Sequence, residues 1–201
     1  MVGAGLTWIC WRANLPILRR GFLPHLINTL NLRGEGVEIG VAGGVFSQTV
    51  LTRSGLRVLY SVDLWRTFPE EEYKDVSNCA QKEMDAKHAL AKTLLAQYGK
   101  RSVLLRAASP AAAQLFTDVS LDFVYIDANH TYANAAKDIA AWWPKVKQGG
   151  IFAGHDYLDG NLPQGIFGVK SAVDDFIRET NETLYVTPER WPTWYVIKEK
   201  A

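Results

Sequence analysis

Short apolar segments that are rich in β-branched and aromatic residues alternate along the chain with amphipathic segments of helical spacing. The apolar segments predict seven strands, near residues 37–39, 57–62, 102–109, 121–127, 151–157, 183–189 and 193–200. The intervening helical segments cover residues 45–53, 81–99, 110–116, 131–150 and 169–180. This alternation is typical of βαβ units, so we expect a parallel sheet with helices on both faces.

The last two predicted strands are joined differently from the others. Their connection runs only from Pro188 to Pro192, which is too short for a parallel crossover, so they should pair antiparallel. The predicted fold class is therefore α/β: a Rossmann-like, doubly wound sheet of seven strands that is mostly parallel and has an antiparallel last strand.

Composition and charge limit the kinds of molecule that the protein is expected to bind. Hydrophobic residues make up 48% of the chain, and 22 basic against 21 acidic residues give a net charge of +1. This balance is typical of an ordinary globular protein and argues against nucleic-acid or membrane-surface binding, which both favour a basic excess. Cys10 and Cys79 are the two cysteines, and we expect reduced thiols. With no signal peptide or membrane span recognised, the predicted location is cytoplasmic.

The first predicted strand runs into a turn that is rich in glycine. Glu38 and Gly40 are followed by Gly43 and Gly44, so the G-x-G-x-x-G pattern of dinucleotide-binding proteins is not met. Glycines here permit positive φ angles and a close approach of a ligand to the backbone. Asp63 ends the second strand, where an acid can accept hydrogen bonds from both ribose hydroxyls; as an alternative, it caps a helix.

Polar residues follow the fourth and fifth predicted strands. "FVYIDANHTY" carries Asp127 and His130, and "IFAGHDY" carries His155 and Asp156. Ligands bind at the carboxyl ends of strands in open parallel sheets, so these side chains should meet there. Two carboxylates and an imidazole form an incomplete shell for a divalent cation that leaves positions for substrate oxygens. The alternative is that they only hold the loops in place.

These motifs resemble those of class I S-adenosylmethionine (SAM)-dependent methyltransferases over residues 35–198. Glu38, Gly40 and Gly44 match the pattern E/D-x-G-x-x-x-G, and "IDANHTY" with "GHDY" resembles the macrocin O-methyltransferase subgroup. The resemblance implies a cation, Mg²⁺ or Mn²⁺ with others not excluded, bound by Asp127, His155 and Asp156. It also implies that His130, beside Asp127, is the catalytic base. The implied SAM-binding residues are Glu38, Gly40, Gly43, Gly44, Asp63, Leu64, Ala108, Ser109 and Asp127.

One position departs from the family pattern. Ala108 stands where the family often has an acid that binds the adenine amino group, so the backbone or Ser109 would have to serve. Trp65 either walls the adenosine pocket or packs the loop after Asp63. Residues 66–82 and 157–168 are the expected substrate lid.

The leading hypothesis is a SAM-dependent methyltransferase that acts on a hydroxyl of a small molecule, such as a sugar or secondary metabolite. We expect residues 1–34 to form a helical cap on the substrate side and residues 35–201 to form the SAM-binding domain, with self-association into a homo-oligomer left open. The alternatives are a nucleotide-dependent oxidoreductase and a catalytically silent SAM-binding subunit.

Overall fold

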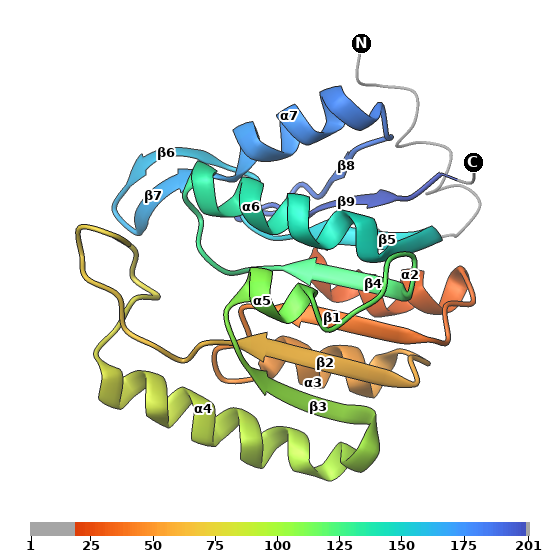
Figure 1. Ribbon diagram of the computed structural model, residues 1–201, viewed down its shortest axis with the longest axis horizontal. Coiled ribbons are helices and arrows are strands. Elements are labelled where there is room, and N and C mark those ends of the chain that lie inside the picture. The colour runs from red at the N-terminus through yellow and green to blue at the C-terminus, as the bar shows by residue number, and fades with distance from the viewer. Residues whose placement is uncertain (1–18, 200–201) are drawn as a thin grey trace.

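The computed structural model describes residues 19–199 and centres on one twisted sheet of seven strands (Figure 1). In spatial order the strands are β3 (Ser102–Arg106), β2 (Val58–Asp63), β1 (Glu35–Ile39), β4 (Leu121–Ile126), β5 (Val146–Gly154), β9 (Trp194–Ile197) and β8 (Tyr185–Val186). The five strands from β3 to β5 are parallel, and β9 is antiparallel to both of its neighbours. This arrangement confirms the predicted fold class.

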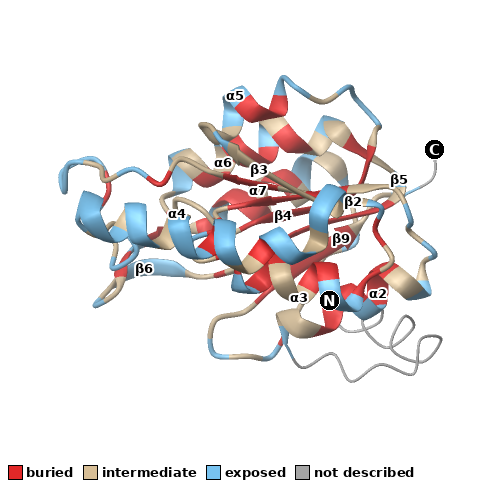
Figure 2. Cartoon of the chain, turned by 90° about the horizontal axis from the view of Figure 1, so that it is seen from below, coloured by how far each residue is buried: buried red, intermediate tan, exposed pale blue. Residues whose placement is uncertain are grey.

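Helices cover both faces of the sheet because its side chains alternate between two apolar cores. One core joins Val124 and Ile126 of β4 to α5 (Ser109–Ala113), α6 (Tyr132–Trp142) and α7 (Val169–Thr180). The other joins Phe123 and Tyr125 to α2 (Leu23–Thr29), α3 (Val45–Arg53) and the end of α4 (Gln81–Leu95). Every residue of β4 is buried, and Figure 2 shows buried residues concentrated in the strands and on the helix sides that face them.

Some predicted boundaries were wrong. The helix predicted over residues 131–150 ends earlier, because Pro144 lies in the short 3₁₀ helix η3 (Trp143–Lys145) and β5 begins at Val146. The strand predicted over residues 102–109 ends at Arg106, since Pro110 at the first turn of α5 starts a helix. A 3₁₀ helix, η2 (Ala96–Arg101), follows α4, and another, η1 (Arg20–Phe22), precedes α2.

The segment expected to form part of a lid contains a hairpin that the sequence analysis did not predict. Strands β6 (Asp159–Leu162) and β7 (Gly165–Gly168) form a separate antiparallel sheet. Asp75, in the loop between β2 and α4, forms a β-bridge with Gly165. The two predicted lid segments therefore lie side by side, beyond the carboxyl ends of the parallel strands (Figure 1).

The N-terminal predictions are tested only in part. Helical pieces expected before residue 19, and Cys10, lie outside the described residues, whereas Cys79 is a free thiol. None of the helices within residues 19–199 has the length and apolar character needed to cross a membrane.

Candidate active site

A cavity of about 480 Å³ opens at the carboxyl ends of β1, β2, β3 and β4. This volume is in the range of small-molecule and cofactor sites. Its lining includes several of the predicted site residues, namely Gly40, Asp63, Leu64, Ala108, Ser109, Asp127 and His130. The glycine turn, the ribose-binding candidate and the acid and imidazole after β4 therefore share one space.

Gly40 is needed where β1 leaves the sheet against the end of β4. Its φ is +86°, and a Cβ atom placed there would lie 1.8 Å from the backbone oxygen of Asp127. The Asp127 amide also donates a hydrogen bond to the Ile39 carbonyl at 2.8 Å. Any side chain at position 40 would therefore displace the backbone that carries Asp127.

The other glycines and Glu38 have different surroundings. Gly44 starts α3 in the left-handed conformation, and a Cβ on Gly43 would lie 3.1 Å from Leu90. Within the described part of the chain, neither these two glycines nor Glu38 lines the cavity. Glu38 is 2% exposed and accepts a hydrogen bond from the Ser47 hydroxyl. Burial raises its pKa to about 8, against the opposing effect of Ser47.

Asp63 organises the loops around it through both carboxylate oxygens. Oδ2 accepts hydrogen bonds from the amides of Val41 and Ala42, each at 2.9 Å, and Oδ1 accepts one from Trp65 at 2.8 Å. A carboxylate has about four acceptor positions, so roughly one remains for a ligand hydroxyl. The three amides belong to loop residues and not to the first turn of a helix, so the predicted alternative of a helix cap is wrong. Asp63 instead holds the loops after β1 and β2 and has limited capacity for ribose.

Trp65 packs the loop and does not wall the cavity. Its ring is fully buried, stacks on His88 with 4.3 Å between ring centroids, and donates a hydrogen bond to the Ala42 carbonyl at 2.8 Å. Of the two readings of Trp65, loop packing therefore fits the structure.

At the β3 end of the cavity, the structure brings in an acid that the sequence analysis missed. Asp138 of α6 lines the cavity beside Ala108 and Ser109, although it is only 6% exposed. The Ser109 hydroxyl donates to Asp138 Oδ1 at 2.5 Å. Burial raises the pKa of Asp138 to about 6, while the Ser109 hydrogen bond acts in the opposite direction.

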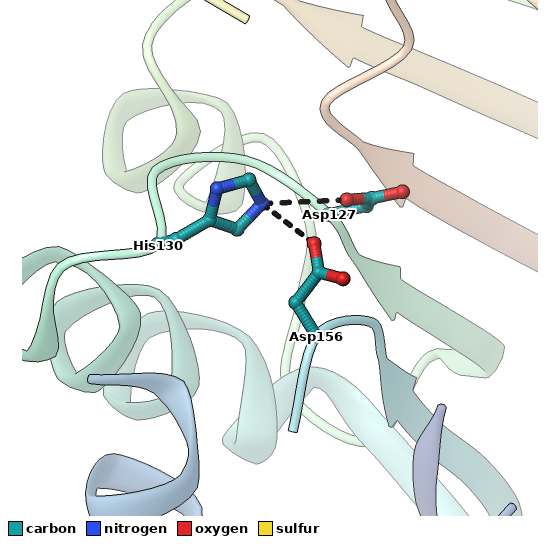
Figure 3. Close-up of side chains that lie close together, drawn as sticks. All are labelled: Asp127, His130 and Asp156. Carbon is teal, nitrogen blue, oxygen red and sulfur yellow. Dashed lines mark ion pairs between the residues drawn. The ribbon is translucent and has the colours of Figure 1, made fainter. Parts of the chain in front are cut away.

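Asp127, His130 and Asp156 come together after β4 and β5 (Figure 3). His130 Nε2 lies 3.0 Å from Asp156 Oδ2 and 3.6 Å from Asp127 Oδ1. One ligand atom from each residue lies within 4.8 Å of the others. Two carboxylates with the imidazole of either His130 or His155 beside them suit a divalent cation such as Mn²⁺, Fe²⁺ or Zn²⁺, and Mg²⁺ less well.

His130 Nε2 is directed toward the two carboxylates. The atom is buried, yet neither carboxylate contact is aligned well enough to be a hydrogen bond among the described residues. Nε2 therefore faces both acids and is placed to meet a group that binds between them.

Asp75 fixes the orientation of His130 and was also missed by the sequence analysis. Its side chain is 2% exposed, and Oδ2 lies 2.8 Å from His130 Nδ1. The His130 ring also stacks on Phe167 of β7 at 4.9 Å between ring centroids. Burial opposes a charge on the imidazole, but Asp127, Asp156 and Asp75 outweigh it and raise the pKa of His130 to about 12.

His155, the predicted third metal ligand, stands at the edge of this cluster. Its Nδ1 atom lies 2.9 Å from Asp156 Oδ1 and 4.0 Å from Asp127 Oδ2. Asp156 adopts a left-handed backbone conformation with φ at 52°. Burial opposes ionisation of Asp156, but His130 and His155 lower its pKa well below the usual range.

Arg20, near the start of the described residues, places a positively charged guanidinium beside Asp127. Its Nη1 atom lies 2.9 Å from Asp127 Oδ2, and its guanidinium lies over the Phe46 ring. The Arg20 amide donates to Glu189 Oε1 at 2.8 Å. Such a contact depends on how distant segments pack, so no local motif near Arg20 indicated it.

Comparisons with known proteins agree with this arrangement. A family model described as a methyltransferase domain matches residues 37–157, more than half of the chain. The chain therefore belongs to this methyltransferase domain family. No curated protein matches at a significant level of sequence similarity. The match does not distinguish the macrocin-type subgroup from other members.

Solved structures with low sequence identity share the fold. A Staphylococcus aureus protein provisionally named a caffeoyl-CoA O-methyltransferase is 16% identical, covering 96% of this chain and 90% of its own, with a TM-score of 0.64. A provisionally named O-methyltransferase from Klebsiella pneumoniae is 15% identical, with 94% and 86% coverage and a TM-score of 0.60. Burkholderia thailandensis 1,6-didemethyltoxoflavin-N1-methyltransferase, solved with S-adenosylhomocysteine, is 14% identical, with 96% and 81% coverage and a TM-score of 0.55.

Proposed function

We propose that the protein is a SAM-dependent methyltransferase that transfers a methyl group to a hydroxyl of a small molecule. The observation that carries the proposal is that one cavity is lined by Gly40 and Asp63 and also by Asp127 and His130. A methyl donor and the groups that handle an acceptor's proton can therefore lie next to each other. Neighbours with O-methyltransferase names support this choice, while the N1-methyltransferase shows that the same fold serves nitrogen acceptors.

The donor would lie along the carboxyl ends of the parallel strands. In this arrangement Asp63 and Leu64 would contact the ribose and Ala108 and Ser109 would lie at the adenine end, while Gly40 lines the same cavity. When bound, SAM supplies an already activated methyl group. The chain's own contribution is then mainly to hold the acceptor oxygen in line with it, about 3 Å away.

Asp127 and Asp156 are proposed to hold a divalent cation, with His155 as the third ligand and the substrate hydroxyl in an open position. When bound, such a cation lowers the pKa of a hydroxyl that coordinates it. Asp127 already pairs with Arg20 at 2.9 Å, so the guanidinium would share this carboxylate with the cation.

His130 is proposed as the base that takes the proton of the hydroxyl, and Asp75 as the residue that positions it. Asp75 holds Nδ1 at 2.8 Å and so directs Nε2 toward Asp127 and Asp156. The role requires Nε2 without a proton, a state favoured when the charges of the two acids are compensated. The hydroxyl proton would pass to Nε2 while the oxygen forms its bond to the methyl group, and the S–CH₃ bond of SAM would break to leave S-adenosylhomocysteine.

Transfer of a labelled methyl group from SAM to a panel of small hydroxylated molecules tests this function. We expect divalent-cation-dependent label in at least one sugar or phenol. His130→Ala should keep its affinity for S-adenosylhomocysteine and lower turnover about 100-fold or more. His25→Ala, a change at an exposed histidine of α2, is the matched control. Binding of NAD in place of SAM would instead favour an oxidoreductase, and SAM binding without transfer would favour a silent subunit.

A further inference from the structure

The adenine end of the proposed SAM site lacks the acid that the resemblance leads one to expect. Ala108 occupies that position at the end of β3 and has no side-chain acceptor. The exocyclic amino group of adenine is a hydrogen-bond donor, so a buried site without an acceptor would leave it unsatisfied.

Asp138 brings an acceptor to the same end of the cavity from a different helix. It lies on the buried side of α6 together with Ala135, Ile139 and Trp142. An acid in an otherwise apolar stripe is unusual, since buried carboxylates normally have a partner or a ligand. Asp138 has one such partner, the hydroxyl of Ser109.

Ser109 locates Asp138 at the β3 end. The Ser109 hydroxyl donates to Asp138 Oδ1 at 2.5 Å and accepts a hydrogen bond from Trp142 Nε1 at 2.9 Å. The carboxylate is therefore held against the residues that follow β3. Among residues 19–199 no hydrogen bond is made to Asp138 Oδ2, and Asp138 lines the cavity. Asp138 Oδ2 is thus available to accept a hydrogen bond from a ligand at the β3 end of the cavity.

We propose that Asp138 binds the exocyclic amino group of the SAM adenine and so takes the place of the acid missing at Ala108. This inference rests on the proposed function, because it assumes that SAM occupies the cavity. The raised pKa of Asp138, about 6, still leaves the carboxylate largely ionised near pH 7. A charged acceptor makes a stronger hydrogen bond to an amino group than a neutral one does.

The test compares S-adenosylhomocysteine with its 6-deamino analogue, which lacks only the amino group. Calorimetric titrations measure both affinities for the wild-type protein and for Asp138→Ala. We expect Asp138→Ala to lower the affinity for S-adenosylhomocysteine by about tenfold to a hundredfold, while the affinity for the analogue changes little. An equal loss of affinity for both compounds would show that Asp138 has only a structural role, and it would overturn the proposal.

Two further variants keep the test decisive. Asp138→Asn preserves the side-chain volume and should reduce the preference for the amino compound by roughly threefold or more. Asp118→Ala removes an acid that is 65% exposed and paired with Lys145 on the surface, and should leave both affinities unchanged. An unchanged preference in folded Asp138→Asn would contradict the proposal. Absence of S-adenosylhomocysteine binding to the wild-type protein would overturn the proposed function itself, and the inference with it.

Discussion

The buried carboxyl of Glu38 should make stability depend on pH in a defined direction. It lies 2% exposed behind the glycine turn, and its pKa is raised from 4.5 to about 8 by burial. A group with a raised pKa binds its proton more tightly in the folded state than in the unfolded chain. Its contribution is therefore present below pH 4.5 and is lost as the pH rises toward 8.

The size of this effect follows from the two pKa values. Between pH 5 and pH 8 the wild-type protein should lose about 3 kcal/mol of stability relative to a variant with a neutral side chain at position 38. Glu38→Gln is that variant, since an amide has the same shape and can still bond to Ser47. The difference in stability between the two proteins should thus shift in favour of Glu38→Gln as the pH rises.

Urea unfolding at pH 5, 6.5 and 8 measures this difference directly. Glu35→Gln is the matched control, because Glu35 lies on the same strand, is partly exposed and pairs with Arg57 at 2.6 Å. The control should lack the 3 kcal/mol trend. A stability difference for Glu38→Gln that stays constant across the three pH values would refute the assignment of Glu38 as a buried, proton-binding acid.

Three other changes probe the rest of the site. Gly40→Ala should lower the free energy of unfolding by roughly 3 kcal/mol or more and abolish S-adenosylhomocysteine binding, because its Cβ would lie 1.8 Å from a backbone oxygen. Gly21→Ala, which has open space around it, is the control and should change neither stability nor binding in thermal-shift and binding assays. Asp75→Asn should lower turnover about 100-fold and leave S-adenosylhomocysteine affinity within about twofold, since Asp75 orients His130 without lining the cavity. An equal loss of turnover and affinity would show that Asp75 has only a general structural role. Asp127→Asn and Asp156→Asn should each weaken Mn²⁺ binding about tenfold or more by calorimetry, and wild-type-like affinity in both would remove the proposed cation site.

Much of the fold could be predicted because its strands are buried on both faces. Such strands appear as apolar runs, as "LDFVYI" does for β4, and the short connection before β9 left only an antiparallel pairing. The β6–β7 hairpin gave no comparable signal. Strand β6 is mostly exposed, and both strands have only four residues and include glycines, Gly160 in β6 and Gly165 and Gly168 in β7, so β-propensity marked neither strand.

The candidate site also combines residues whose proximity could be predicted from the sequence with residues whose proximity could not. The sheet topology predicted that Asp127 would meet His155 and Asp156, with His130 nearby, because they follow neighbouring parallel strands. In the structure His130 lies between the two acids, and His155 lies at the edge of the cluster. Asp75 reaches His130 only through the packing of one loop on the hairpin, which no local pattern encodes. Asp138 did leave a signal, since it interrupts an apolar stripe on α6, and helical periodicity read together with polarity could have found it.

The central claim is that the cavity holds the methyl donor with its sulfur beside the cluster after β4 and its purine beside the end of β3. A crystal structure with S-adenosylhomocysteine tests this most directly. We expect the sulfur next to Asp127 and His130, and the purine amino group within hydrogen-bonding distance of Asp138 Oδ2. A well-ordered complex with the ligand outside this cavity, or with its two ends reversed, would contradict it.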